Sequence, residues 1–259
     1  MLSIILSYYK NPANLRVILS ALAQQSVQDF ELILSEDDHN PATASLLKGY
    51  PFPIQHLYQA EDKGFRKNLM LNRSVRAAHF ERLAFIDGDC VPHRHFVKEY
   101  AKMQRGFYYA GRAVMLGPKI SEGILAREQF QAPSLWRLYL SKSRKQKEGL
   151  YFPLLVIGPK NRGLVGRNWG ICKSDLEKIN GFDLDYEGPG VGEDTDVEWR
   201  LIKAGLEKRS MKNKAIIYHL YHPRSYSQDP VKHNFQLMQE KKKAGQHFCL
   251  RGLQQTPNS

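Results

Sequence analysis

Short apolar runs alternate with segments of helical periodicity through the first hundred residues, and this alternation limits the possible folds more than any other feature. A short continuous apolar run is typical of a buried strand in a parallel sheet. Such strands are predicted at Ser3–Leu6, Phe30–Leu34, Ile54–Tyr58 and Leu83–Ile86. Helices are predicted at Pro12–Leu22, where Asn11 is the N-cap residue and Pro12 opens the first turn, at Asn68–His79 and at His93–Met103. The pattern predicts an α/β fold with a mostly parallel central sheet and helices on both faces.

The second half of the chain alternates less regularly. Further strands are predicted at Phe107–Leu116, Leu154–Gly158, Arg167–Cys172 and Ala215–His219, and a helix at Glu193–Ala204 that Gly205 ends. Val231, Phe235 and Met238 form a helical stripe before a polar tail. We therefore expect one α/β domain over residues 1–225, with halves at 1–105 and 106–225, and a basic helical appendage over 226–259.

The chain is strongly basic, with a formal net charge of +12. A basic chain favours anionic partners, which include nucleic acids, anionic lipid surfaces and phosphorylated substrates. The excess of Lys and Arg is concentrated between residues 137 and 167 and again from Lys203 to the end. The same residues would also suit an ordinary solvated face.

Localisation is predicted from what the sequence lacks. Its three cysteines have no metal-ligand spacing, which fits a reducing compartment. No apolar run approaches the ~20 residues of a membrane span, and the apolar start is too short for a signal peptide. We expect a cytoplasmic protein that attaches, if at all, to the surface of the membrane.

Acidic clusters follow two of the predicted strands. Glu36, Asp37 and Asp38 end the second strand, and Asp87-Gly88-Asp89 ends the fourth. Ligands of open α/β sheets bind at the carboxyl ends of the strands. Two carboxylates around a glycine can face one Mg²⁺ or Mn²⁺ ion, which would bridge the oxygens of a diphosphate. A simple polar turn is the alternative interpretation of this tripeptide.

Two further segments carry charge where a helix begins. Four acids follow the glycines of Gly190–Gly192, at Glu193, Asp194, Asp196 and Glu198. Acids at this position complement the helix dipole, but one or two would be enough for that. Their number therefore suggests that one of them points into a site, where it could act as a general base. Arg66 and Lys67 stand at the start of their predicted helix, where cations are unfavourable, so an anion such as a phosphate is expected nearby. The alternative interpretation is that these two residues lie in a solvated loop.

Together these segments resemble glycosyltransferase family 2, whose members have the GT-A fold, over about Met1–His222. The motifs that carry the resemblance are Ile4-Ile5-Leu6-Ser7-Tyr8 with Asn11-Pro12, Gln24-Gln25-Ser26, Asp29–Ile33, Gln59–Lys67 with Asn72, Phe85–Pro92, Asn168-Trp169-Gly170-Ile171, Asn180-Gly181-Phe182-Asp183 and Gly192-Glu193-Asp194. The later motifs are similar to those of galactosyltransferase-like and chondroitin-polymerase-like members. One segment departs from the family. Its usual Asp-Asp-Gly-Ser is replaced by Glu36-Asp37-Asp38-His39, so either Glu36 or Asp37 could contact the base.

The resemblance implies an inverting transfer of a sugar from a nucleotide-diphospho-sugar, by default a UDP-sugar, to a saccharide hydroxyl. Residues 1–105 would bind the donor and 106–225 the acceptor. The donor would contact Ser7, Tyr8, Glu36, Asp37, Arg66, Asp87 and Gly88. Mn²⁺ or Mg²⁺ would be bound by Asp89 and Asp87, together with either His219 or His222. Asp194 would be the catalytic base, and Glu193, Asn168 and Trp169 would contact the acceptor.

The resemblance also suggests a hexosyl- or hexosaminyltransferase of bacterial lipopolysaccharide or capsule synthesis, with a saccharide or lipid-linked acceptor. The basic tail would then hold the protein at an anionic membrane surface. A nucleotidyltransferase acting on a sugar phosphate is the alternative, but it needs a glycine-rich loop after the first strand, and Tyr8–Pro12 contains no glycine. Charge alone suggests a nucleic-acid partner, and no recognisable motif supports one, so we expect none.

Overall fold

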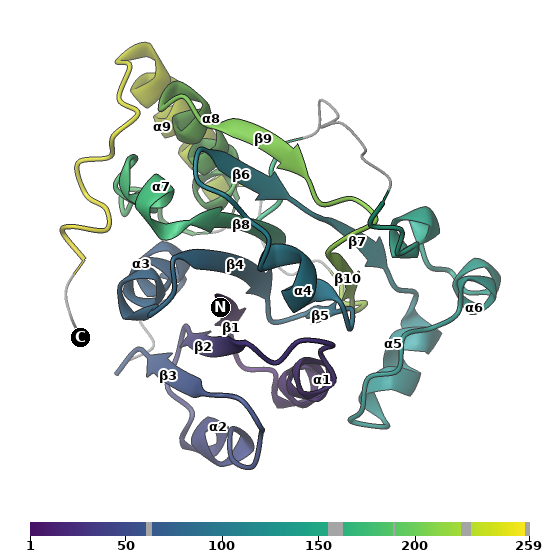
Figure 1. Ribbon diagram of the computed structural model, residues 1–259. Coiled ribbons are helices and arrows are strands. Elements are labelled where there is room, and N and C mark those ends of the chain that lie inside the picture. The colour runs from purple at the N-terminus through teal and green to yellow at the C-terminus, as the bar shows by residue number, and fades with distance from the viewer. Residues whose placement is uncertain (61–63, 155–162, 189, 224–228, 257–259) are drawn as a thin grey trace.

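The central sheet has seven strands in the order β3–β2–β1–β4–β8–β6–β9 (Figure 1). The computed structural model describes the chain except residues 61–63, 155–162, 189, 224–228 and 257–259. The strands of this sheet, from edge to edge, are Ile54–Tyr58, Phe30–Glu36, Leu2–Tyr8, Arg82–Asp87, Asn168–Cys172, Phe107–Ala110 and Glu207–Ser210. Only β8 runs antiparallel to its neighbours, so the predicted mostly parallel α/β fold is confirmed.

Helices cover both faces of this sheet because alternate residues of its central strands are apolar on both sides. Ile4 and Leu6 of β1 pack with helices α1 (Pro12–Ala23) and α4 (Phe96–Tyr100). Ile5, between them, packs on the other face with helices α3 (Lys67–Ala77), α7 (Lys173–Glu177) and α8 (Thr195–Lys203). The short helix α2 (Pro41–Leu46) packs beside α1.

The predicted strand Phe107–Leu116 is two strands in two different sheets. β6 (Phe107–Ala110) belongs to the central sheet, whereas β7 (Arg112–Met115) joins β5 (Cys90–Pro92) and β10 (Ile216–His219) in a second sheet of order β5–β10–β7. The chain bends at Gly111, where a Cβ atom would lie only 2.2 Å from Cγ of Asn168. Only glycine allows this close approach.

Several short helices lie in the segments that connect the later strands. They are the α-helices α5 (Pro118–Leu125) and α6 (Leu135–Leu140) and the 3₁₀ helices η1 (Gln146–Gly149) and η2 (Val191–Glu193). The predicted strand Leu154–Gly158 lies almost entirely outside the described residues.

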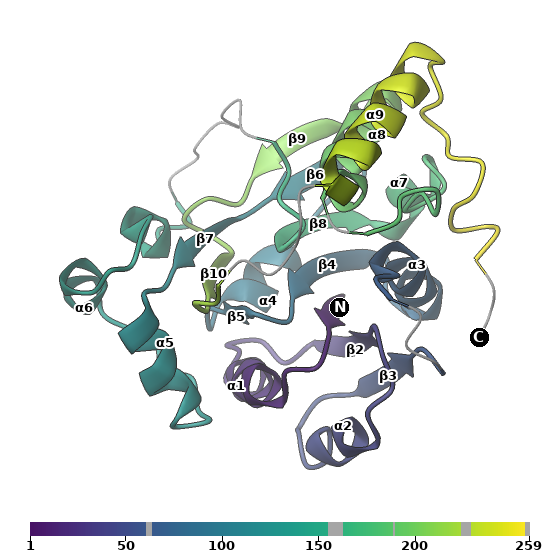
Figure 2. The same cartoon turned by 180° about the vertical axis from the view of Figure 1, so that it is seen from behind.

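The C-terminal segment, predicted as a basic helical appendage over 226–259, packs against the domain. Helix α9 (Asp229–Lys243) lies beside α8 (Figure 2), and Lys242 lies over the ring of Trp199. Beyond α9, the amide of Leu184 donates to the carbonyl oxygen of Arg251 at 2.7 Å, and Leu253 belongs to the apolar core on the α3 side of the sheet. The described part of this segment therefore completes the core.

Lys241 fastens α9 to the domain. Its ammonium lies 2.5 Å from Oδ2 of Asp183 and 2.6 Å from Oδ2 of Asp185, and its side chain is only 7% exposed. The cation and the two carboxylates compensate one another's charge in this poorly solvated position. Among the described residues, no helix is long and apolar enough to cross a membrane.

Replacing Lys241 with alanine is expected to lower the free energy of unfolding by about 3 kcal/mol, because it removes the cation that contacts the buried carboxylate of Asp183. Urea denaturation measures the change. Lys243→Ala, which removes an exposed lysine from the same helix turn, is the control and should have almost no effect. Equal stabilities of the two variants would show that α9 is not held by Lys241.

Candidate active site

A cavity of about 610 Å³ opens at the carboxyl ends of β1 and β4. After β1, the chain adds β2 and β3 on one side and then β4 on the other, so the strand order reverses here, as it does at ligand sites of open α/β sheets. We call this space the donor cavity. Its walls include seven of the predicted donor or metal residues, namely Ser7, Tyr8, Asp37, Asp87, Gly88, Asp89 and His222.

The pairing of β1 with β4 positions the acidic tripeptide. Ser7 pairs with Asp87 in a parallel register, so the two strands end side by side. A Cβ atom on Gly88 would lie 2.9 Å from the carbonyl oxygen of Ser7. Glycine therefore lets the turn lie directly against β1 and keeps Asp87 and Asp89 at the cavity.

Asp37 lines the donor cavity, and Glu36 does not. Glu36 is fully buried, and its carboxylate accepts hydrogen bonds from Thr43 Oγ1 at 2.7 Å and pairs with His56 Nε2 at 2.5 Å. Glu36 points away from the cavity because successive residues of an extended chain point to opposite faces. Asp37 is held by the amide of Arg66, at 3.0 Å, and by Gln59.

The side chain that reaches the cavity from the start of α3 is Lys67. Arg66 does not line the donor cavity, contrary to expectation, and contributes its backbone amide to Asp37 instead. Arg66 and Lys67 stand at the start of α3, where successive side chains point about 100° apart. The two neighbours therefore face different cavities.

Lys67 bridges two carboxylates that are far apart in the sequence. Its ammonium lies 2.7 Å from Oδ1 of Asp87 and 2.9 Å from Oε2 of Glu193. Burial would lower the pKa of Lys67, but the attraction of Asp87 and Glu193 outweighs it and raises that pKa. Burial also raises the pKa of Glu193, and Lys67 offsets this only in part. The cation thus joins the end of β4 to the start of α8.

Asp194 is the N-cap residue of α8. Its Oδ1 accepts hydrogen bonds from the amide of Thr195 at 2.5 Å and from the hydroxyl of Thr195 at 2.9 Å. Its Oδ2 accepts a weaker one, at 3.4 Å, from the amide of Gly166. Burial raises the pKa of Asp194 despite these donors. A raised pKa makes a carboxylate a better proton acceptor near neutral pH.

Asp89 lies against two histidines. Its Oδ2 is 3.0 Å from Nε2 of His222 and 3.3 Å from Nε2 of His219. One ligand atom from each of the three residues can be chosen so that all lie within 4.8 Å of one another. Burial would raise the pKa of Asp89, but the hydrogen bonds from both histidines keep it well below its usual value, and Asp89 in turn raises the pKa of His222.

Strand pairing explains why these three residues meet. His219 pairs with Cys90 across the antiparallel β5–β10 ladder, which places it directly beside Asp89. The sequence left a choice between His219 and His222, and the structure brings both to Asp89. Asp87 stands apart from this group and pairs with Lys67, so its predicted role as a metal ligand is not supported by the geometry.

Trp169 and Asn168, which were expected to contact an acceptor, are both buried. Trp169 is 1% exposed and stacks on Phe85 with ring centroids 4.4 Å apart. Asn168 is buried, donates to the carbonyl oxygens of Arg112 and Ala215, and accepts from the hydroxyl of Tyr100. Trp169 is enclosed by the core, and Asn168 also lines a small cavity next to β8.

Two of the four acids near the start of α8 also serve the fold. Asp196 pairs with the buried Arg200 at 2.6 Å, and Glu198 accepts hydrogen bonds from the amide of Leu164 and the hydroxyl of Tyr108. Of the other two, Glu193 contacts Lys67, which lines the donor cavity, and Asp194 caps α8.

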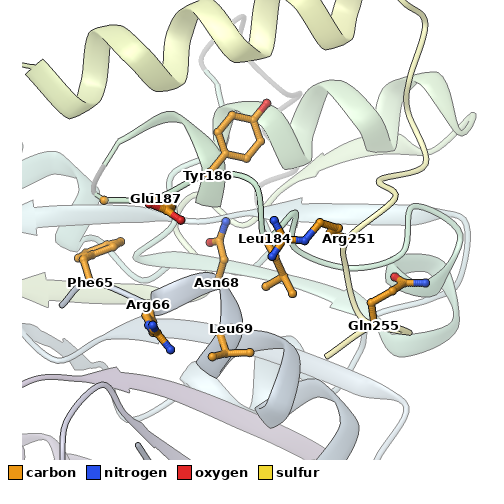
Figure 3. Close-up of a pocket in the computed structure, with 10 residues that line it drawn as sticks. Phe65, Arg66, Asn68, Leu69, Leu184, Tyr186, Glu187, Arg251 and Gln255 are labelled. Carbon is orange, nitrogen blue, oxygen red and sulfur yellow. The ribbon is translucent and has the colours of Figure 1, made fainter. Parts of the chain in front are cut away.

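A second cavity, of about 520 Å³, adjoins the donor cavity (Figure 3). Phe65 lines both cavities. Arg66 and Leu69, at the start of α3, form one wall of the second cavity, and Arg251 and Gln255 approach it from the C-terminal segment. The C-terminal segment therefore contributes to the surroundings of the site.

Several residues of the donor cavity were not among the expected site residues. They are Tyr9, Asn11, Asn14, Ser35, Phe65, Lys67, Met70 and Pro223. Position in the sequence gave a signal for some of them, because Ser35 precedes the acidic run and Asn11 and Asn14 open the helix that follows β1. Pro223 lies far along the chain, and only tertiary structure brings it there.

The fold and the cavity at the reversal of strand order define the class of α/β proteins that bind ligands at the carboxyl ends of parallel strands. Residues 3–179 match "Glycosyl transferase family 2", and the chain belongs to this family. Residues 158–223 also match "N-terminal domain of galactosyltransferase".

Curated relatives are consistent with this assignment. The chain is 25% identical over 236 residues to validoxylamine A glucosyltransferase of Streptomyces hygroscopicus subsp. jinggangensis, a match that covers 80% of the chain and 52% of the relative. It is 22% identical over 283 residues to chondroitin synthase of Escherichia coli, and this match covers 98% of the chain and 38% of the relative. The chain thus spans about half the length of these relatives or less.

Solved structures share the fold. Mannosyltransferase PcManGT of Pyrobaculum calidifontis, in complex with GDP-Man and Mn²⁺, matches with a TM-score of 0.57 and 14% identity, over 95% of this chain and 62% of that one. GalNAc-T7 with UDP, GalNAc and Mn²⁺ matches with a TM-score of 0.63 and 12% identity, over 93% of this chain and 47% of that one. TarS of S. aureus in complex with UDP-GlcNAc matches with a TM-score of 0.61 and 14% identity, over 92% of this chain and 65% of that one. These likenesses confirm the predicted GT-A fold.

Replacing Lys67 with methionine is expected to lower the free energy of unfolding by about 3 kcal/mol at pH 8, since it leaves Asp87 and Glu193 without their cation. The loss should shrink toward pH 5. In the variant the folded-state pKa of Glu193 rises further above its unfolded value, so the folded protein binds protons more readily and gains stability as the pH falls.

Urea denaturation at the two pH values measures both effects, with Lys119→Met, an exposed lysine of α5, as the control. A Lys67→Met loss that is the same at pH 5 and pH 8 would show that the Glu193 carboxylate does not depend on Lys67.

Proposed function

We propose that the protein is an inverting, metal-dependent glycosyltransferase that moves a sugar from a nucleotide-diphospho-sugar to a saccharide hydroxyl. The observation that carries the proposal has two parts. The carboxylate of Asp89 lies with two imidazoles at the donor cavity. The carboxylate of Asp194, whose pKa is raised, is connected to this cavity through Asp87, Lys67 and Glu193. Membership of glycosyl transferase family 2 and the GT-A neighbours support the same reaction class.

The group of Asp89, His219 and His222 fits a divalent transition-metal ion. Mg²⁺ prefers oxygen ligands and several waters, whereas imidazole nitrogens suit first-row transition metals. Two neighbouring structures contain Mn²⁺. Of the two expected ions we therefore favour Mn²⁺ over Mg²⁺. When bound, the ion would neutralise the charge that develops on the departing nucleoside diphosphate.

Asp194 is proposed to accept the proton of the attacking hydroxyl. It lies at the N-terminus of α8, and its pKa is raised by burial. Glu193, the preceding residue, is held by Lys67 and would orient the acceptor through a hydrogen bond. A base and a donor cavity on opposite sides of the reacting carbon are what a single inverting displacement requires.

The donor residues are proposed to be Ser7, Tyr8, Asp37, Asp87 and Gly88, with Lys67 in place of Arg66. We keep a UDP-sugar as the donor, since two of the neighbouring structures contain UDP or UDP-GlcNAc and one contains GDP-Man. We keep both hexosyl and hexosaminyl transfer as candidate reactions. Nucleotidyl transfer is not favoured, since the family match and the absence of glycine from Tyr8–Pro12 both oppose it.

The setting is proposed from the family resemblance, as lipopolysaccharide or capsule synthesis on a saccharide or lipid-linked acceptor. A cytoplasmic protein that binds the inner face of the membrane would fit this role. Because Lys241 is used within the fold, any attraction to anionic lipid would come from exposed residues such as Lys203 and Lys243.

Asp89→Ala is expected to abolish the Mn²⁺-dependent stabilisation of the protein by UDP, because it removes the carboxylate that both histidines contact. The measurement is the thermal unfolding midpoint with UDP, with and without Mn²⁺. Asp29→Ala, an exposed aspartate before β2, is the control. A full Mn²⁺-dependent shift in Asp89→Ala would contradict the metal assignment.

Asp194→Asn is expected to leave UDP binding unchanged and to slow sugar transfer by about 10²–10⁴-fold, the usual contribution of a general base. Asparagine caps a helix as well as aspartate does, so α8 should stay intact. UDP titration and product formation from a panel of UDP-sugars and oligosaccharides measure the two effects. Near-normal turnover by Asp194→Asn would contradict its role as the base.

A further inference from the structure

Helix α6 presents an apolar face to solvent. The side chains of Trp136, Tyr139 and Leu140 are 75%, 51% and 83% exposed. Their spacing of i, i+3 and i+4 places all three on one side of the helix. Leu138 points to the opposite side and is buried in the same apolar core as α1 and β10. Exposed apolar patches on a folded domain mark interaction sites, so the outer face of α6 is a candidate for one.

The sequence around this face is basic. Residues 135–152 contain one acid, Glu148, and it is buried. The cations of the same stretch are all exposed, and they are Arg137, Lys142, Arg144, Lys145 and Lys147. An apolar helix face with aromatic residues and flanking cations is typical of surfaces that lie in the headgroup region of a membrane.

Exposed apolar side chains continue beyond η1. They are Leu150 and Phe152. Helix η1 packs against the inner side of α6, because a Cβ atom on its last residue, Gly149, would lie 3.6 Å from Cδ1 of Leu138. The amide of Phe152 donates to the carbonyl oxygen of Asn213 at 2.8 Å, which fixes the backbone of this segment. The exposed apolar residues therefore belong to two segments that the fold holds next to each other.

The α6 face lies at the edge of the molecule but close in the fold to the metal group. Both views place α6 on the side away from α3 and α9 (Figure 1, Figure 2). Beyond α6, Arg144 pairs with Met115 in an isolated bridge, and Met115 pairs with His219. Paired backbones lie about 5 Å apart, so the backbone of Arg144 runs about 10 Å from that of His219.

An anionic lipid surface suits the α6 face better than a second copy of the chain does. A symmetric contact through this face would bring the same cations of two copies together, and facing like charges oppose association. Anionic lipid attracts those cations instead. The headgroup region also accepts Trp and Tyr rings, whose polar N–H and O–H groups keep hydrogen-bond partners there.

We propose that the exposed face of α6 inserts into an anionic lipid surface, with Trp136 and Leu140 in the headgroup region and the flanking cations against lipid phosphates. This inference rests on the proposed function and names the surface that would bring the metal group close to a lipid-linked acceptor. It assigns the attachment to α6 rather than to the lysines of α8 and α9.

The first test measures sedimentation of the protein with sucrose-loaded vesicles. One set of vesicles contains equal parts of phosphatidylglycerol and phosphatidylcholine, and the other contains phosphatidylcholine alone. The variants are Trp136→Gln and Leu140→Gln, each of which should lose at least about tenfold in affinity for the mixed vesicles, because a large apolar side chain no longer leaves water. Phe235→Gln, which removes an exposed aromatic ring from α9, is the matched control and should bind as the wild type does.

The second test changes charge at constant net charge. Arg137→Gln combined with Lys142→Gln removes two cations beside the α6 face, and Lys203→Gln combined with Lys243→Gln removes two exposed cations from α8 and α9. Each cation near an anionic surface is worth about fivefold in affinity, so the first double variant should lose about 20-fold and the second much less. The wild type should bind the mixed vesicles at least about tenfold more tightly than the neutral ones.

Tryptophan emission supplies a separate signal for insertion. The chain contains Trp136, Trp169 and Trp199, and of these only Trp136 is exposed. The emission should shift to the blue when mixed vesicles are added, because the indole of Trp136 leaves water. Trp136→Phe should still sediment with the vesicles but should not show the shift.

The proposal would be overturned if the wild type did not bind mixed vesicles, or if each control lost as much affinity as its α6 counterpart. A dimer in sedimentation velocity that Trp136→Gln dissociates, without any effect of this variant on vesicle binding, would also overturn it, since a second copy would then cover the face. Thermal stabilisation by UDP and Mn²⁺ is measured on the same samples. Wild type that binds vesicles but not UDP would count against the proposed function and not against the lipid-binding face.

Discussion

The candidate site depends on one buried cation. Lys67 holds Asp87, at the end of β4, and Glu193, at the start of α8, at hydrogen-bond distance. Without this cation, two carboxylates would face each other in a poorly solvated space, and their repulsion would push the two parts of the domain apart. The ion pair therefore sets the spacing between the donor cavity and the candidate base.

The same device recurs away from the site. Lys241 brings Asp183 and Asp185 together, and Arg200 is buried against Asp196. Lys241 joins α9 to the loop between α7 and η2, and Arg200 joins α8 to the same loop by donating to the carbonyl oxygens of Ile179 and Gly181. A basic chain thus uses some of its lysines and arginines inside the fold, and its net charge is a poor guide to the surface that a partner would meet.

The order of the functional segments in the sequence differs from their order around the site. The second sheet is the clearest case, because β10 inserts between β5 and β7 and thereby places His219 next to Asp89. The antiparallel β8 pairs with β4, so the segment that precedes β8 also approaches the end of β4, and Gly166 in this segment donates to Asp194. Residues of the two halves of the chain meet because strands from the second half complete sheets begun by the first.

The sequence by itself determined most strands and helices of the first hundred residues, though not α2 or β5, together with the GT-A fold and the acids that end β2 and β4. These follow from local periodicity and from motifs read in order. The sequence could not assign directions to neighbouring side chains. Glu36 and Asp37, or Arg66 and Lys67, differ by one position and point in different directions, and the burial of Trp169 depends on Phe85 from another strand. Only the tertiary structure decided that both histidines join Asp89, that Lys67 bridges two distant carboxylates and that the C-terminal segment completes the core. Each of these is a contact between residues far apart in the chain, and its geometry is set by packing and strand register, which no local pattern encodes.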